Sequence, residues 1–295
     1  MKSLGQYRYR VVDVFTERPL EGNALAVFPD ASGLDGATMQ KIARELNLSE
    51  TTFVGPATRA DCAVQVRIFT PTLELSFAGH PTIGTSFVLL EEGIISADGG
   101  RFALEEKIGP VAVRVESGPR PLIWLTTPSI NYGPTFDREL CARVLGLEPK
   151  DLLEITPQLV SAGNPTLFVA VKDPETVDRA GFDLSGMARL KAAEQDPMCV
   201  FVFAPTPTGA YSRMFAPEYG VVEDPATGSS TGPLAAFMLR HQLIAGDEGA
   251  RFVSEQGTKM GRRSLLHILL HGPQGREGIE VGGSVAPVAE ATMKL

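Results

Sequence analysis

Cysteine is rare in this chain of 295 residues, and basic residues are fewer than acidic ones. The three cysteines, Cys62, Cys141 and Cys199, are odd in number and far apart, and no two form a Cys-x-x-Cys pair. This spacing excludes a disulfide framework and a zinc set, so we expect reduced, buried thiols. The 27 Lys and Arg against 35 Asp and Glu leave a net charge of -8. Because such a surface repels phosphate backbones and anionic lipid, we expect no nucleic-acid partner and no membrane partner.

Long apolar runs and nucleotide-binding motifs are also missing. The longest apolar stretches, such as residues 166–171 and 265–270, have the length of strands, whereas a membrane span needs roughly 20 residues. Residues 1–10 contain no apolar core of the kind that a signal peptide requires, which predicts a cytoplasmic protein. Neither the Gly-x-Gly-x-x-Gly fingerprint nor the P-loop spacing occurs, so we expect no NAD, FAD or ATP. No other cofactor and no metal ion are expected.

The remaining composition is typical of a folded protein with a mixture of helices and strands. Hydrophobic residues make up 43% and charged residues 21% of the chain, which excludes a disordered or fibrous protein. At about 150 residues per domain, the length predicts two domains. Apolar residues alternate at Tyr7, Tyr9 and Val11, as in a half-buried strand. Asp35 can cap a helix that ends near Asn47.

Further elements follow from the same patterns in both halves of the chain. The expected strands are residues 23–28, 51–54, 63–69, 166–171, 199–204, 252–255 and 265–270. The expected helices are residues 79–92, 137–145 and 229–241. The first half and the second half therefore have the same mixed plan.

An internal repeat is the strongest organisational signal. Residues 67–71, Arg-Ile-Phe-Thr-Pro, match residues 213–217, Arg-Met-Phe-Ala-Pro, and each is followed by a glycine at the start of an apolar helix, Gly79 or Gly228. Two related domains with a cleft between them are therefore expected.

The domain boundaries are expected to be 1–118 and 119–283. Residues 118–121, Gly-Pro-Arg-Pro, are the candidate hinge. A strand at about 284–295 could pair back with the first domain.

Both glycines stand where a helix begins. There the free backbone N–H groups and the helix dipole favour an anion, such as a carboxylate or an enolate-like charge in a pocket. The alternative is that both segments are only well-capped core helices in which glycine allows close packing.

Three side chains near these positions can carry acid–base chemistry. His80 is predicted to reach the cleft, although a capping or packing histidine is an equally good interpretation. Asp224, directly before a proline, suits a turn and is compatible with a contact to substrate. Glu50 lies at a helix-to-strand junction from which it could project into the cleft, although an isolated carboxylate in a loop is usually solvated.

Four segments in order resemble the PhzF family of phenazine-biosynthesis-like isomerases. They are residues 13–27, residues 49–53 (Ser-Glu-Thr-Thr-Phe), residues 77–81 (Phe-Ala-Gly-His-Pro) and residues 223–229 (Glu-Asp-Pro-Ala-Thr-Gly-Ser). The resemblance implies an α+β protein with the diaminopimelate epimerase fold. Its two pseudo-symmetric domains would each be a curved mixed sheet around a central helix, with the active site in the cleft between them.

The resemblance also implies roles for individual residues. Glu50 would be the acid/base that takes a proton from one carbon and returns it to another, provided that partial burial raises its pKa toward neutrality. His80 and Asp224 would fix the substrate and manage its amino or hydroxyl proton. The expected substrate-binding residues are Asn23, Gly79, Gly228 and Ser229.

The expected function is a cofactor-independent isomerase that acts on a small carboxylate-bearing metabolite, in a protein that forms homodimers as relatives often do. One alternative is an amino-acid epimerase or racemase that uses Glu50 and His80 as unequal bases. Racemisation by two thiols is disfavoured, because His80 and Ser229 stand at the helix starts where related racemases have cysteines. The other alternative is a non-catalytic protein that binds a small molecule. The loop at residues 161–165 lies where substrate contacts vary in this family.

Overall fold

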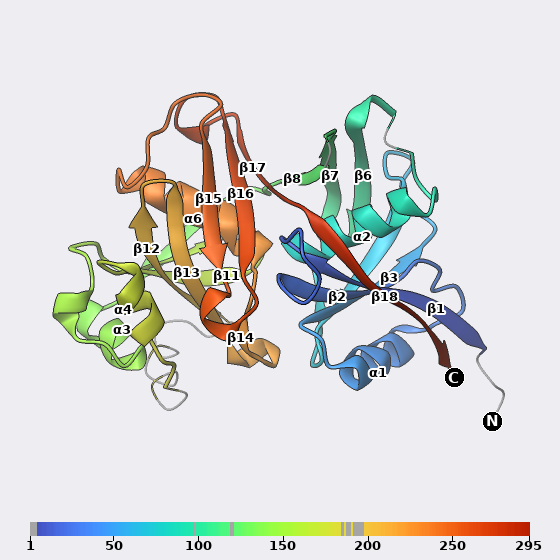
Figure 1. Ribbon diagram of the computed structural model, residues 1–295, viewed down its shortest axis with the longest axis horizontal. Helices are drawn as coiled ribbons and strands as arrows, with labels where there is room; N and C mark the ends of the chain where they lie inside the picture. The colour runs from blue at the N-terminus through green and yellow to red at the C-terminus, as the bar shows by residue number, and fades with distance from the viewer. Residues whose placement is uncertain (1–4, 97, 119–120, 184–185, 187–189, 191–197) are drawn as a thin grey trace. The chain divides into compact units, whose positions relative to one another are not determined.

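The computed structural model describes residues 5–96, 98–118, 121–183, 186, 190 and 198–295. The chain divides into two compact units, Met1–Thr126 with Gly282–Leu295, and Thr127–Val281 (Figure 1). The first unit therefore continues past residue 118, where the sequence analysis placed the boundary. Of the expected hinge at 118–121, residues 119 and 120 lie outside the described residues.

The first unit is built on one mixed sheet. Its strands are β1 (Gln6–Val14), β2 (Asn23–Phe28), β3 (Glu50–Gly55), β4 (Val64–Phe69), β5 (Glu74–Leu75), β6 (Arg101–Glu106), β7 (Gly109–Glu116), β8 (Leu122–Thr126) and β18 (Val285–Lys294). They pair in the order β18-β1-β2-β3-β4-β6-β7-β8, and β5 also pairs with β4. The pairs β2–β3 and β4–β6 are parallel, and the others are antiparallel.

Two helices cover the sheet of the first unit. Helix α2 (Gly79–Glu91) contacts β1, β2, β3, β8 and β18, and ten of its thirteen residues are buried, as a helix that is apolar on all sides requires. Helix α1 (Gly36–Leu46) packs on β3 and β4 and lies on the opposite side of the sheet from α2 (Figure 1). As predicted, Asp35 caps α1 by accepting a hydrogen bond from the backbone of Thr38, and the helix ends at Asn47 in the left-handed conformation.

The second unit has its own mixed sheet. Its strands are β9 (Asn131–Thr135), β10 (Gln158–Ser161), β11 (Pro165–Ala170), β12 (Cys199–Thr206), β13 (Gly209–Ala216), β14 (Val221–Asp224), β15 (Arg251–Gln256) and β16 (Ser264–His271), and β17 (Gly278–Gly283) leads back to the first unit. They pair in the order β9-β10-β11-β12-β13-β15-β16, and β14 also pairs with β13. The pairs β11–β12 and β13–β15 are parallel.

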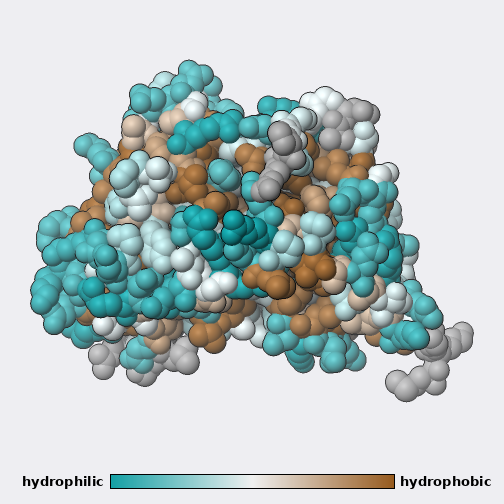
Figure 2. All heavy atoms as spheres, in the orientation of Figure 1, coloured by the Kyte–Doolittle hydropathy of each residue, from teal (hydrophilic) through white to brown (hydrophobic). Residues whose placement is uncertain are grey.

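Among the described residues, the α-helices of the second unit are α3 (Arg138–Val144), α4 (Pro174–Arg179) and α6 (Gly228–Arg240). Helix α6 contacts β10, β11 and β16 and lies behind β15 and β16 in Figure 1. It is buried along most of its length, like α2 in the first unit. The ring of Phe237 on α6 stacks on that of Phe168 on β11, with centroids 5.7 Å apart. Figure 2 shows hydrophilic residues gathered over α3 and α4.

The two units repeat one connectivity. In each, an antiparallel hairpin (β1–β2 or β10–β11) is followed by a second antiparallel hairpin (β3–β4 or β12–β13). The first strand of the second hairpin pairs in parallel with the last strand of the first. A buried helix, α2 or α6, then connects two parallel strands, β4 to β6 or β13 to β15. The internal repeat that the sequence predicted is therefore present in the strand pairing.

The cysteines are all free thiols. Cys141 and Cys199 are buried as expected, but Cys62 is only partly buried, so that prediction was wrong for this residue. Within the described part of the chain, no helix is long and apolar enough to cross a membrane.

Candidate active site

Three of the predicted site residues meet at the amino end of α2. Asn23 begins β2, Glu50 begins β3, and His80 is the second residue of α2. Because β2 and β3 are parallel neighbours, their first residues share one edge of the sheet. Nε2 of His80 lies 3.2 Å from Oε2 of Glu50, and Nδ1 of His80 lies 3.2 Å from the amide nitrogen of Asn23. The first unit therefore brings a carboxylate, an imidazole and an amide together.

The imidazole of His80 is neutral. Burial lowers its pKa to about 3, because a charged ring would lose its hydration. Since the amide of Asn23 donates to Nδ1, the single ring hydrogen is on Nε2, the ring nitrogen beside Glu50, although the contact of 3.2 Å does not have the geometry of a hydrogen bond. The side chain of Glu50 is 15% exposed, against 3% for His80. Glu50 is therefore the member of this group that a bound molecule can reach.

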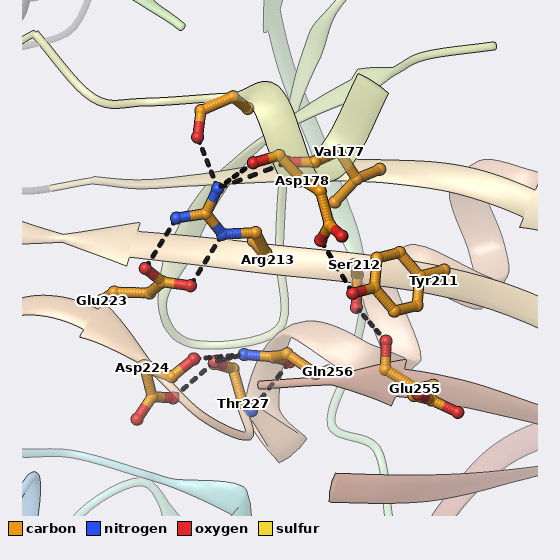
Figure 3. Close-up of polar contacts among 11 residues, drawn as sticks. Val177, Asp178, Tyr211, Ser212, Arg213, Glu223, Asp224, Thr227, Glu255 and Gln256 are labelled. Atoms are coloured by element: carbon orange, nitrogen blue, oxygen red, sulfur yellow. Dashed lines mark hydrogen bonds and ion pairs between the residues drawn. The ribbon is translucent and has the colours of Figure 1, made fainter. Parts of the chain in front are cut away.

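A second polar cluster surrounds Asp224 at the end of β14. Oδ2 of Asp224 accepts a hydrogen bond of 2.5 Å from the hydroxyl of Thr227. The amide of Gln256 donates to the Asp224 carbonyl at 2.7 Å and to the Thr227 hydroxyl at 3.0 Å, and accepts from the Thr227 backbone at 3.1 Å (Figure 3). Gln256 thereby fixes the turn that carries Asp224 into α6. Gln256 was not among the site residues predicted from the sequence.

Ser229 in the second unit occupies the place of His80 in the first. Each is the second residue of its buried helix. The amide of Asn164, just before β11, donates to the Ser229 hydroxyl at 3.3 Å, as Asn23 donates to His80. Asn164 belongs to the loop that the sequence analysis marked as variable, and only the repeat identifies it as the partner of Ser229.

The repeat also shows where the two units differ chemically. Leu25 and Thr166 each stand two residues after the asparagine of their unit, Asn23 or Asn164. Leu25 lies opposite Glu50 in the parallel pair β2–β3, and Thr166 lies opposite Cys199 in the parallel pair β11–β12. The place of the Glu50 carboxylate in the first unit is therefore taken by the thiol of Cys199 in the second.

Gly79 and Gly228 are the first residues of α2 and α6, as predicted. The residue before each helix makes no capping hydrogen bond through its side chain. The first backbone N–H groups of both helices are thus not covered by a cap, which is the usual condition for binding an anion there. Contact of Gly79 and Gly228 with a substrate stays a prediction.

A bidentate ion pair anchors the strand that leads toward each helix. Arg67 on β4 binds Glu74 on β5 at 2.7 and 3.0 Å, and Arg213 on β13 binds Glu223 on β14 with both distances at 2.8 Å. Each guanidinium also lies over the phenylalanine two positions later, 5.1 or 5.0 Å from the ring centre. Figure 3 shows Arg213 between Glu223 and the segment of Val177 and Asp178. These pairs hold β5 and β14, and with them the turns before α2 and α6, in place.

The groups collected here are proton donors and acceptors. Among the described residues, no three His, Cys, Asp or Glu side chains are placed to hold one metal ion. A partly exposed carboxylate beside a neutral imidazole is suited to taking a proton from a bound molecule and giving it back.

A family model for phenazine biosynthesis-like proteins matches residues 12–291 of the chain. The chain belongs to the PhzF family. A PhzF-family relative, the trans-2,3-dihydro-3-hydroxyanthranilate isomerase of Pseudomonas aeruginosa, is 37% identical over 298 residues, which cover 98% of this chain and 100% of the relative. Other curated relatives of this PhzF-family chain are also named as isomerases.

Solved structures agree with this membership. The crystal structure of a PhzF-family phenazine biosynthesis protein from Bacillus anthracis covers 99% of both chains with a TM-score of 0.86 at 24% identity, which supports the fold alone. A predicted epimerase from Pseudomonas aeruginosa has a TM-score of 0.82 at 34% identity and covers 97% of this chain and 99% of its own. The PhzF-type fold thus extends over both units.

Proposed function

We propose that this PhzF-family protein is a cofactor-independent isomerase that moves a proton within a small carboxylate-bearing metabolite, with Glu50 as the acid/base. The observation that carries the proposal is the contact of 3.2 Å between the partly exposed Glu50 carboxylate and the buried, neutral His80. A carboxylate that faces an N–H on one side and bound substrate on the other can change its protonation state without leaving its position.

The proposed reaction has two proton transfers. Glu50 first accepts a proton from one carbon of the substrate. The electron pair of that C–H bond forms a new double bond to the neighbouring carbon, and the pair of the former double bond moves to the carbon at its far end. The protonated Glu50 then returns the proton to a different carbon, so the product has the composition of the substrate. His80, held at Nδ1 by Asn23, stays beside Glu50, with its Nε2 3.2 Å from the carboxylate, and limits where that carboxylate can lie. No external acid, base or oxidant is consumed.

We further propose that groups of both units act on the same bound molecule, in the interdomain cleft that the family resemblance implies. Asp224 and Ser229 would contact the amino or hydroxyl groups of the substrate. The N–H groups at Gly79 and Gly228 would receive its carboxylate. The proposal is supported by the relatives, which match the chain over both units.

The first substrate to test is trans-2,3-dihydro-3-hydroxyanthranilate, because the 37% identical relative is named as its isomerase. Epimerisation of an amino acid is the second candidate, favoured by the 34% identical structure described as a predicted epimerase. A non-catalytic binding protein is the third.

One experiment in D₂O separates these three functions. The proposal predicts that purified protein without added cofactor converts trans-2,3-dihydro-3-hydroxyanthranilate. Because the carboxyl group of the partly exposed Glu50 can exchange with solvent before it returns the proton, part of the product should carry solvent deuterium at a ring carbon, as followed by NMR. Deuterium at the α-carbon of an added amino acid would instead indicate an epimerase. Thermal stabilisation by small carboxylates, with neither turnover nor exchange, would indicate a binding protein.

A further inference from the structure

A buried carboxyl group that the proposed reaction does not use lies beside the first turn of α2. Glu106, the last residue of β6, is 4% exposed. The hydroxyl of Thr82 lies 2.5 Å from Oε1 of Glu106 and 2.7 Å from the carbonyl of Ala78, the residue that caps α2. The backbone N–H of Ala78 also binds this carboxyl group. Glu106 therefore contacts the start of the helix that carries His80.

Glu106 has the surroundings of a neutral acid. Among the described residues its Oε2 is buried without a hydrogen-bond partner, which would be costly for an ionised carboxylate. Burial raises the pKa of Glu106 to about 8. When protonated, Glu106 can donate to the Thr82 hydroxyl, which in turn donates to the Ala78 carbonyl. Both hydroxyl hydrogens, that of Glu106 and that of Thr82, then have an acceptor.

The described elements around Glu106 bring no charged group that would favour its ionised form. Helix α2 carries His80, which is neutral, and β7 places Gly109 opposite Glu106. The neighbouring carboxylate, Glu105, is bound by the backbone and hydroxyl of Thr58. No charged group among the described residues contributes to the pKa of Glu106.

The second unit contains a natural comparison. The repeat aligns Phe69 with Phe215, and therefore Gln65 with Tyr211. Glu105 lies opposite Gln65 in the pair β4–β6, and Glu255 lies opposite Tyr211 in the pair β13–β15. The residues that follow, Glu106 and Gln256, are therefore equivalent. Gln256 binds the backbone and hydroxyl of Thr227, the capping residue of α6. A neutral amide thus supports the start of α6. The structural task does not need an ionisable group, yet the first unit has one.

Because Glu106 can ionise and Gln256 cannot, only the first unit has a supporting group that can change the charge at the start of its helix. The amino end of a helix carries a partial positive charge that attracts anions. An ionised carboxylate buried in the first turn would offset this charge, whereas a protonated acid leaves it available. The protonation state of Glu106 consequently sets how strongly the amino end of α2 attracts a bound carboxylate.

We propose that Glu106 is a positioning residue, whose neutral form keeps the amino end of α2 free for the anionic group of the substrate and whose ionisation weakens that binding. The proposal rests on the proposed function in one respect only, namely that a carboxylate binds at this helix end. The protonation of Glu106 itself is independent of any reaction.

The test compares the native protein with Glu106→Gln, which places in the first unit the side chain that Gln256 provides in the second. Binding of anthranilate, a stable carboxylate probe, is measured by calorimetry from pH 6 to 10, with turnover of trans-2,3-dihydro-3-hydroxyanthranilate followed in parallel. In the native protein the Kd and KM should rise, by at most about tenfold per pH unit, as the pH passes through about 8 and should level off once Glu106 is ionised, with kcat unaffected. In Glu106→Gln both constants should stay flat over that range.

Stability gives a readout that does not depend on any ligand. Because folding raises the pKa of Glu106, its stabilising contribution is complete below the ordinary value of 4.5 and is lost as the pH rises through about 8. The denaturation midpoint of the native protein should therefore fall relative to that of Glu106→Gln across this range. Glu105→Gln, on the same strand, is the matched control and should keep the alkaline rise in Kd and KM.

The outcomes separate the two proposals. A rise in Kd that is unchanged in Glu106→Gln, or a difference in midpoint that does not vary with pH, overturns the role of Glu106. A flat Kd in Glu106→Gln with no turnover by either protein supports Glu106 as the group that controls anion binding and counts against the isomerase. If anthranilate does not bind the native protein while the midpoints diverge as predicted, the anion site at α2 is wrong and the role of Glu106 falls with it.

Discussion

Glu50→Gln is expected to lower kcat by a factor of about 10² to 10⁴, the usual contribution of a positioned acid/base. Glutamine has nearly the shape of glutamate and can keep the contact with Nε2 of His80, so the site should keep its form. It cannot, however, take a proton from carbon. Binding of anthranilate, measured by calorimetry, should be retained, so the loss would lie in kcat rather than in affinity.

The control is Glu45→Gln, which removes an exposed carboxylate from α1 in the same unit. This variant should turn over substrate at the native rate, and both variants should have native circular dichroism. Undiminished turnover by Glu50→Gln would show that another group performs the proton transfer. Loss of turnover together with loss of anthranilate binding would point to a binding role instead.

Arg213→Met is expected to destabilise the protein by about 3 to 5 kcal/mol, the range for leaving one partner of a buried ion pair uncompensated. The change leaves Glu223 without its bidentate partner. It also removes the hydrogen bonds from Arg213 to the carbonyls of Val177, Asp178 and Ala180. Chemical denaturation, followed by circular dichroism, measures the free energy of unfolding.

The internal repeat provides the matched variant, Arg67→Met. The Arg67 side chain is 33% exposed, against 10% for Arg213, and among the described residues it binds Glu74 and the sulfur of Met39 but no backbone carbonyl. Its loss should cost only about 1 kcal/mol, as for pairs near the surface. Equal costs for the two variants would contradict the idea that the buried carbonyl contacts make Arg213 the stronger anchor.

Local signals account for the elements that the sequence predicted well. Asp35 and Asn47 mark the two ends of α1, and Gly79 with a proline two residues later marks the start of α2. The order of the strands was not predictable in this way, because it depends on pairing between distant segments. The parallel register of β15 on β13, for example, joins segments on either side of α6, and neither segment contains a signal for the other.

The candidate site was predictable to the extent that motifs carry it. Glu50, His80 and Asn23 lie in three separate segments of family-like sequence, and the structure brings them together. Gln256 and Glu106 were missed because each stands at the end of an ordinary strand. They become visible only when strand pairing aligns the two units and shows an amide and an acid at equivalent positions.

The central claim is that one carboxylate both removes and returns the proton. The most direct measurement uses trans-2,3-dihydro-3-hydroxyanthranilate labelled with deuterium at the carbon that loses hydrogen, followed through a single turnover in ordinary water by mass spectrometry. A single acid/base predicts that part of the product retains the deuterium at its new carbon. Product that contains no substrate-derived deuterium, even at the earliest times, would contradict the transfer through Glu50 alone.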